Sequence, residues 1–269
     1  MSIKLIALDI DDTLLNSKGK ITEATKQALD KALDQGIKVV LCSGRPLAGV
    51  TPYLKELGIS GDDQYVVTYN GGLVETVSGK VLSRKILDNQ AYRRIVSYAT
   101  EHKMPYYVLD DQSNVYTSDR DVNRIAVVQA WENQAGIYIR TPDELDPEFE
   151  ITKAAIVGEK ADLDKFEAPV KAEFGNDYYV VRAGDYFLEI MNETANKGTG
   201  LETLTKILGF TPDEVMVFGD ERNDLPMFDF AGSAIAMGNG SDIAKEHSTY
   251  VTDTNDNDGI AKALDKLVF

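Results

Sequence analysis

Short apolar segments alternate with helical patterns at both ends of this 269-residue chain, and this alternation constrains the fold most. Residues 3–8 and 37–41 are almost entirely apolar, as in strands of a parallel sheet that is buried on both faces. Between them, Thr22 is a predicted helix N-cap and Gly36 a predicted helix end. The order returns near the carboxyl terminus, with helices predicted at 198–208, 225–231, 243–247 and 260–268 and strands at 215–218, 234–237 and 250–252. The pattern predicts an α/β fold with a doubly wound, Rossmann-like parallel sheet.

The segment after the second strand extends this sheet. Pro46 opens a predicted helix that ends at Gly58, and residues 65–68 form a third strand. The Asn70-Gly71 pair between residues 65–69 and 73–77 is a strong signal for a β-hairpin, because both residue types tolerate positive φ angles.

The middle of the chain has a different pattern of apolar and polar residues. Its predicted strands look half-exposed and aromatic, at residues 106–109, 115–117, 178–181 and 187–190. Helical patterns at 92–102, 122–132 and 163–174 lie between them. We therefore expect two domains, a Rossmann-like core of residues 1–82 and 192–269 and an inserted α+β module of residues 83–191 with an antiparallel sheet.

Composition excludes several classes of partner. The net charge is -16, from 44 acidic and 28 basic residues, which argues against nucleic acid or an anionic membrane surface as a partner. Cys42 is the single cysteine, so an internal disulfide is excluded and a reducing compartment is indicated. No secretion signal or long apolar run is visible, so we expect a cytoplasmic protein. We also expect a monomer or a weak homodimer.

Carboxylates are crowded at the end of the first strand. Asp9, Asp11 and Asp12 follow residues 3–8 directly, and Thr13 comes next. Like charges this close repel unless a cation or proton lies between them, and oxygen ligands favour Mg²⁺. In extended chain the side chains of Asp9 and Asp11 leave on the same side. The alternative is an acidic turn that ends a strand and caps a helix.

Three more polar groups follow predicted strands or open helices of the core: Ser43-Gly44-Arg45, Asn196-Lys197-Gly198 and Gly219–Asp224. The carboxyl ends of parallel strands share one edge of a sheet, where ligands bind. Each group alone has an ordinary explanation, as a helix cap, a solvated lysine or an acidic turn. Together they predict a cation-binding site beside an anion-binding site, and phosphoryl-transfer enzymes need both.

The order Asp-x-Asp-x-Thr, Ser-Gly-Arg-Pro, Asn-Lys-Gly and Gly-Asp-x-x-Asn-Asp resembles the haloacid dehalogenase superfamily. It is most similar to the Cof-type sugar-phosphate phosphatases with a large inserted cap. The resemblance implies a Mg²⁺-dependent phosphatase that hydrolyses small phosphorylated metabolites, with sugar phosphates expected, through an aspartyl-phosphate intermediate. One departure is Asp12, where many members have glycine; in an extended strand end its side chain would point away from the metal, with little effect.

The resemblance also assigns roles to individual residues. Asp9 is implied as the nucleophile and Asp11 as the general acid and base. Ser43, with Gly44, and Lys197 are implied to bind the phosphoryl oxygens. The implied metal site comprises Asp9, Asp11 through its backbone carbonyl, Asp220 and Asp224, and Asn223 with Asp224 is implied to orient Lys197 or the phosphate.

Substrate choice is expected to depend on the inserted module. The candidates for contacts with the substrate are Glu189, Asn70 and Arg45, although Glu189 is equally compatible with a solvent-facing strand position. Two other functions would use the same acidic, hydroxyl and lysine side chains. One is a phosphotransferase or mutase with aspartyl-phosphate chemistry, and the other is a non-catalytic phosphoacceptor switch.

Overall fold

The computed structural model describes residues 2–269, which form two compact units. The first unit comprises the chain up to Gly44 together with Val50–Ser83 and Asn196–Phe269. The second comprises Arg45–Gly49 and Arg84–Ala195. The division of the chain into two domains with boundaries at 82/83 and 191/192 remains a prediction.

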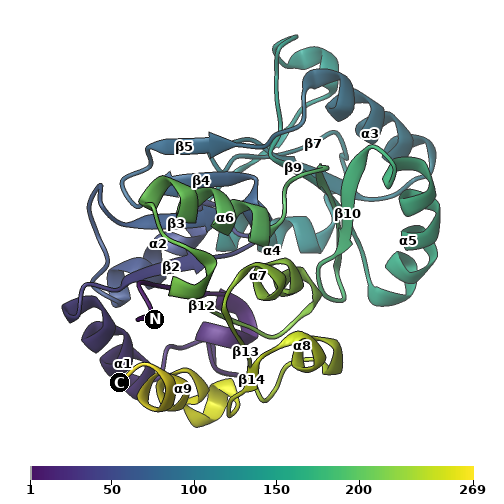
Figure 1. The fold of residues 1–269 in the computed structure, drawn as a ribbon. Coiled ribbons are helices and arrows are strands. Elements are labelled where there is room, and N and C mark those ends of the chain that lie inside the picture. Colours follow the sequence, from purple (N-terminus) through teal and green to yellow (C-terminus); the bar gives the residue numbers. More distant parts are fainter. Residues whose placement is uncertain (1) are drawn as a thin grey trace. The chain divides into compact units, whose positions relative to one another are not determined.

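The first unit is built on an eight-stranded sheet (Figure 1). β1 (Leu5–Leu8) is central and runs parallel to β12 (Val215–Gly219) on one side and to β2 (Lys38–Cys42) on the other. The remaining strands are β13 (Ser233–Ala236) and β14 (Tyr250–Val251) beyond β12, and β3 (Tyr65–Thr68), β4 (Leu73–Thr76) and β5 (Val81–Arg84) beyond β2. The predicted doubly wound parallel sheet is confirmed, and β3 and β4 form the antiparallel pair predicted from Asn70-Gly71.

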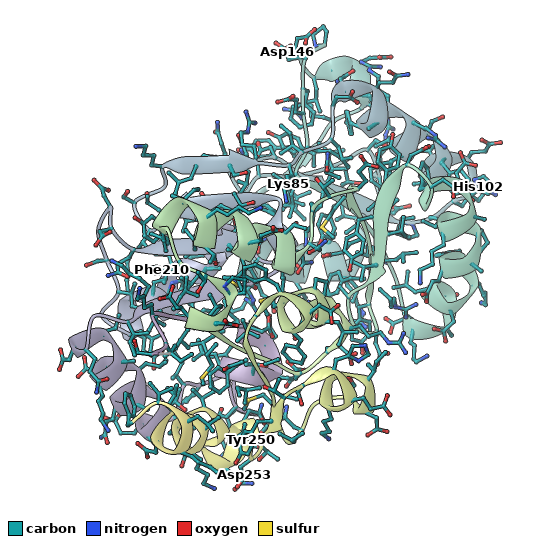
Figure 2. The ribbon with its side chains drawn as sticks, viewed as in Figure 1. Lys85, His102, Asp146, Phe210, Tyr250 and Asp253 are labelled. Atoms are coloured by element: carbon teal, nitrogen blue, oxygen red, sulfur yellow. The ribbon has the colours of Figure 1, made fainter. Side chains whose placement is uncertain are left out.

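Both faces of the central strands are buried. Leu5 and Ala7 pack in a core that α6 (Lys197–Leu208), α7 (Leu225–Phe230) and α8 (Asp242–His247) complete, while Ile6 and Leu8, which point the other way, are also inaccessible. α1 (Glu23–Asp34) contacts β2 and lies beside α9 (Gly259–Leu267), and α2 (Leu47–Glu56) follows β2. Tyr250 and Asp253 lie next to α9 (Figure 2), where Lys262 Nζ is 2.6 Å from Asp253 Oδ2. As predicted, Thr22 caps α1 by accepting the Thr25 N–H.

The second unit is an α+β module with a six-stranded sheet. The strands, in spatial order, are β10 (Tyr178–Arg182), β11 (Phe187–Asn192), β9 (Lys153–Val157), β6 (Tyr106–Leu109), β7 (Val115–Thr117) and β8 (Ile137–Ile139). All pairs are antiparallel except β7 and β8, which α4 (Arg124–Glu132) connects as a parallel crossover. α3 (Asn89–Glu101) and α5 (Lys160–Phe174) contribute to the core on one face of this sheet.

Two expectations for this module differ from the structure. The half-exposed character is wrong for 106–109, because every residue of β6 is buried, whereas β10 is mostly half-buried as predicted. On the face away from α3, for example, Tyr107 is fully buried and donates to Gln129 Oε1 of α4 at 3.4 Å. The central strand β9 and the edge strand β8 also lie outside the four strands predicted for this region.

Within residues 2–269, no helix has both the length and the apolar character needed to cross a membrane.

Candidate active site

The two central strands of the first unit end side by side. β1 and β12 pair in parallel, and the N–H of Asp9, just after β1, donates to the carbonyl of Phe218 at 3.1 Å. Asp220 follows β12 directly. The chain crosses over from β1 toward β2 in one direction and from β12 toward β13 in the other, so this is the point where the strand order reverses. Open α/β sheets bind ligands at such a point.

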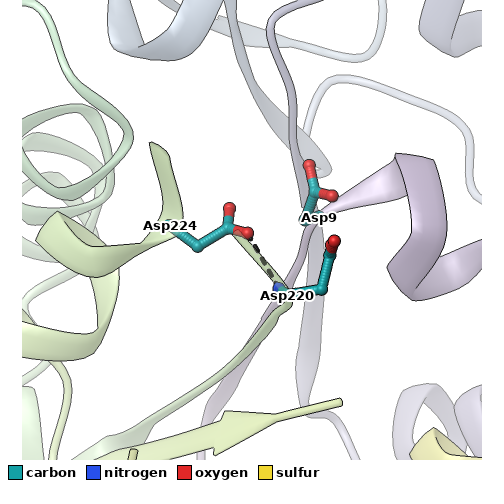
Figure 3. Close-up of side chains that lie close together, drawn as sticks. All are labelled: Asp9, Asp220 and Asp224. Carbon is teal, nitrogen blue, oxygen red and sulfur yellow. Dashed lines mark hydrogen bonds between the residues drawn. The ribbon is translucent and has the colours of Figure 1, made fainter. Parts of the chain in front are cut away.

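Three carboxylates converge there. Asp9, Asp220 and Asp224 each offer an oxygen, and these oxygens lie within 4.8 Å of one another (Figure 3). Asp9 and Asp224 are buried, and Asp220 is half-buried. Burial raises the pKa of Asp9 well above its usual range; Lys197 opposes this and the neighbouring carboxylates reinforce it. Burial, followed by the charge of Asp224, likewise raises the pKa of Asp220 to about 7.

Lys197 is the cation among them. It is the first residue of α6 and fully buried, and its Nζ donates to Asp9 Oδ1 at 2.5 Å and to Asp224 Oδ1 at 2.6 Å. Burial alone would lower the pKa of this ammonium, but Asp224 and Asp9 hold it above its ordinary value. With all four groups ionised, one positive charge faces three negative charges. The arrangement is therefore complementary to a further cation.

Glycines allow the first turn of α6 to pack closely enough against its neighbours for Lys197 to be buried. Gly71, at φ +89°, passes so close to Asn196 that a Cβ would lie 2.0 Å from the Asn196 carbonyl oxygen. A Cβ on Gly198 would lie 2.1 Å from the Pro226 carbonyl oxygen. The side chain of Asn196 accepts the Thr199 N–H at 2.9 Å and so caps the helix immediately before Lys197. Close packing and the cap together fix the position of the ammonium.

Asp224 closes the loop that follows β12. Its Oδ2 accepts the backbone N–H groups of Asp220 at 2.9 Å and Glu221 at 3.1 Å, while its Oδ1 accepts from Lys197. Gly219 makes room, since a Cβ there would lie 2.6 Å from Asp224 Cβ. Asn223, beside it in the 3₁₀ turn Arg222–Asp224, is half-buried. Asp224 is therefore placed to orient both the loop and Lys197.

The turn after β1 differs from the expected extended strand end. Ile10–Leu14 forms a helical turn, interrupted by extended Asp11 and by Asp12 in the left-handed region at φ 57°. The expected extended conformation of Asp12 is therefore wrong: a left-handed position is one that glycine occupies without strain, which accounts for the glycine expected there by resemblance. The turn directs Thr13 back to the site, where its Oγ1 donates to Asp220 Oδ1 at 2.7 Å. Asp11 is exposed and outside the three-carboxylate cluster, but its charge contributes to the raised pKa of Asp9.

Ser43 and Gly44 follow β2, next to β1. Ser43 is buried, its N–H donates to the Val67 carbonyl at 2.9 Å, and its own carbonyl accepts the Asn70 N–H at 2.9 Å. A Cβ on Gly44 would lie 3.0 Å from Asn70 Nδ2, so the hairpin turn and this strand end are in contact. The charges of Lys197 and Asp9 act on the adjacent Cys42, although burial is the larger cause of its raised thiol pKa.

Arg45 and Glu189 belong to the second unit. The suggestion that Glu189 faces solvent is wrong: the residue is buried in β11 and forms an ion pair with Lys153 of β9, which is also buried. Lys153 was missed because the lysine and the glutamate are far apart in sequence. An apolar run that starts with a lysine, at residues 153–157, is the only signal the sequence carries for it.

Comparisons with known proteins agree with this geometry. The sequence model of one protein family, the haloacid dehalogenase-like hydrolases, matches residues 6–264. The chain is 35% identical over 266 residues to the "Putative phosphatase YxeH" of Bacillus subtilis (strain 168), with 98% of each protein covered. It is 31% identical over 264 residues to the 5-amino-6-(5-phospho-D-ribitylamino)uracil phosphatase YcsE of the same organism, with 98% of this chain and 95% of the relative covered.

A solved structure shares the whole fold. The crystal structure of a haloacid dehalogenase-like hydrolase from Bacteroides thetaiotaomicron has a TM-score of 0.87 and 32% sequence identity, covering 99% of this chain and 100% of the other.

Proposed function

Because the chain belongs to the haloacid dehalogenase-like hydrolases and is a phosphatase, we propose that it hydrolyses small sugar phosphates with Mg²⁺ through an aspartyl-phosphate intermediate. The observation that supports this most directly is the cluster of Asp9, Asp220 and Asp224 around one buried ammonium. Its excess of negative charge is complementary to a divalent cation, and a phosphate dianion then needs both cations to approach a carboxylate.

The donor atoms suit Mg²⁺. The cluster offers carboxylate oxygens and neither imidazole nor thiolate, and hard oxygen donors are those that Mg²⁺ prefers. We assign Asp9, Asp220 and the backbone carbonyl of Asp11 as ligands. Asp224 completes the acidic loop, and both its oxygens already accept hydrogen bonds. When bound, the metal would neutralise charge on the transferring phosphoryl group.

The first displacement uses Asp9. Its carboxylate oxygen forms a bond to phosphorus as the ester P–O bond breaks, and the electron pair of that bond leaves on the alcohol oxygen. Asp11 gives this oxygen its proton. Lys197, the Ser43 hydroxyl and the Gly44 N–H hold the phosphoryl oxygens, and Asn223 helps to orient the group.

The second displacement regenerates the enzyme. Asp11, now a carboxylate, takes a proton from water as the water oxygen attacks phosphorus. The bond between phosphorus and the Asp9 oxygen breaks, which releases inorganic phosphate and restores the carboxylate. Asp11 therefore acts twice, first as an acid and then as a base.

The substrate class is a separate part of the proposal. The relative YcsE is named for a substrate that carries a phosphorylated ribityl chain, which is a polyol phosphate. Amide side chains donate and accept hydrogen bonds and carboxylates accept them, so both are suited to hydroxyl groups. We propose that Asn70, Arg45 and Glu189 contribute to the choice among such substrates.

The test is a phosphate-release screen over a panel of phosphorylated metabolites, with and without Mg²⁺. We expect sugar and polyol phosphates to rank highest, chelation to abolish turnover, Mn²⁺ to restore part of it, and Ca²⁺ to inhibit because its looser coordination disturbs in-line geometry. The Asp9→Asn protein should fold and lose at least about three orders of magnitude in kcat. Near-normal activity in that variant, or turnover unchanged by chelator, would contradict the mechanism.

The same screen separates the alternatives. Loss of free phosphate when a second sugar is added would identify a phosphotransferase or mutase. A single burst of phosphate without turnover would identify a phosphoacceptor switch. Glu189→Ala and Asn70→Ala are measured beside wild type, and an unchanged substrate ranking in both would exclude them from substrate choice.

A further inference from the structure

One short loop contacts both of the chain segments that carry the candidate metal ligands. Residues 237–241 connect β13 to α8 in the first unit. This loop lies against the turn that follows β1 and against the residue that follows β12. The proposed mechanism gives it no role.

Asn239 makes the contact to the first segment. Its Nδ2 donates to the carbonyl oxygen of Asp12 at 2.7 Å, and its Oδ1 accepts the N–H of Asn255 at 2.9 Å. The side chain of Asn255 in turn donates to the carbonyl of Leu15 at 2.8 Å. Asn239 itself is exposed, so its side chain adds little to the hydrophobic core. It links parts of the chain that are more than 200 residues apart.

The same loop holds the second segment. The N–H of Ser241 donates to the carbonyl of Asp220 at 2.8 Å, and its Oγ lies 3.2 Å from that oxygen. Gly240 passes so close that a Cβ would lie 2.9 Å from the Asp220 carbonyl oxygen. The loop thus bonds the backbone carbonyl of Asp220, while Thr13 bonds its carboxylate.

We propose that Asn239 is a positioning residue, which holds the left-handed turn at Asp12 and so sets the spacing between the Asp9–Thr13 turn and Asp220. A non-glycine residue in the left-handed region is held there by its surroundings, and here the Asn239 amide bonds the carbonyl of that residue. Small displacements of catalytic groups can cost up to about a hundredfold in rate. The catalytic consequence rests on the proposed function, whereas the structural contact does not.

The experiment compares Asn239→Ala and Asn239→Asp with wild type. The aspartate keeps an oxygen for the Asn255 N–H but loses the donor to Asp12. Asn257→Ala is the matched control, because Asn257 is also exposed and its Nδ2 donates at 2.8 Å, but to Thr254 within its own turn. The readouts are kcat and KM for para-nitrophenyl phosphate at saturating Mg²⁺, the melting temperature, and hydrogen exchange of residues 10–15 in the metal-free protein.

We expect both Asn239 variants to lose about tenfold in kcat with KM within about twofold, and to exchange faster in residues 10–15, while the melting temperature stays within a few degrees. Asn257→Ala should match wild type in all of these. Full activity in Asn239→Asp, a loss of kcat without faster exchange, or faster exchange with unchanged kcat would each overturn the inference. If wild type hydrolyses no phosphate ester, the proposed function fails, and the exchange comparison still decides whether Asn239 holds the turn.

Discussion

Asp11 is required twice by the proposed mechanism, and the two uses differ in their dependence on the leaving group. An alkoxide must be protonated as it leaves, whereas para-nitrophenolate departs readily without a proton. In Asp11→Asn we therefore expect kcat/KM, which reports the first displacement, to fall by about 10²- to 10⁴-fold for a sugar phosphate and by about tenfold or less for para-nitrophenyl phosphate. Steady-state kinetics on the two substrates measures both. Equal losses would argue against Asp11 as the general acid.

Asp220 makes the stability of the metal-free protein depend on pH. Its folded-state pKa is raised by burial to about 7, above the unfolded value of 3.8, so the folded state binds more protons between these values. Stability that depends on this proton is present at low pH and is lost as pH rises through about 7. In chelator, we expect the melting temperature of wild type to fall from pH 5.5 to pH 8 more steeply than that of Asp220→Asn. Equal slopes would show that Asp220 is not the group responsible.

At the residue scale, chemistry was easier to predict than conformation. The identities and spacing of Asp9, Lys197 and Asp220 are visible in the sequence, because each follows a strand or opens a helix of a recognisable type. The left-handed turn at Asp12 is not visible, because its local sequence favours an extended strand end equally well. Contacts such as that from Asn239 stabilise the turn, and they come from the other end of the chain.

At the scale of elements, the position of α6 depends on close approach between backbones. A methyl group on Gly71 would meet the Asn196 carbonyl at 2.0 Å, and the residue is also at φ +89°. We expect Gly71→Ala to destabilise the protein by about 2–4 kcal/mol and to reduce kcat, because the helix start that carries Lys197 must shift.

Gly209→Ala is the control for this prediction. Gly209 also has a positive φ, at +71°, but nothing lies within 4 Å of its added Cβ. The cost there is limited to the backbone strain, about 1 kcal/mol, and kcat should not change. Chemical denaturation gives both free energies of unfolding. If the two variants were equally destabilised, close packing at Gly71 would not be what positions α6.

The elements of the second unit show why prediction was less complete there. Most strands of the first unit are apolar runs between clear helical patterns, whereas β9 carries a buried lysine, Lys153, that forms an ion pair with the buried Glu189 on the neighbouring strand. A buried lysine is stable in a strand only with its partner, and that pairing is a property of the sheet. Glu189 could be recognised as unusual from the sequence, but neither its burial nor its partner could.

At the scale of the whole molecule, topology brings together motifs that the sequence separates. Asp9 and Asp220 are far apart along the chain, yet the parallel pairing of β1 with β12 places them at adjacent strand ends. This outcome follows from the alternation of strands and helices, so the general location of the site could be predicted before any contact was known. The inserted residues 84–195 do not interrupt the sheet of the first unit, because strands before and after the insertion pair directly with each other.

The net charge of -16 also acts at this scale, and it opposes the approach of an anionic substrate. Raising the ionic strength from about 0.01 to about 0.1 M shortens the Debye length from about 30 Å to about 10 Å, which screens this repulsion at a distance. We therefore expect kcat/KM for para-nitrophenyl phosphate to rise about two- to threefold over this range, chiefly through KM. The measurement uses tetramethylammonium chloride, with Mg²⁺ kept saturating throughout, so that added cations do not compete at the site.

A sugar bisphosphate provides the matched comparison. Its second phosphate roughly doubles the negative charge of the substrate. Its kcat/KM should therefore rise more steeply with ionic strength than the kcat/KM for para-nitrophenyl phosphate. The slope against ionic strength thus measures the sign of the potential along the approach to the site. A fall in kcat/KM for both substrates would mean that Lys197 and the bound cation dominate that potential, and that the acidic surface does not repel substrate.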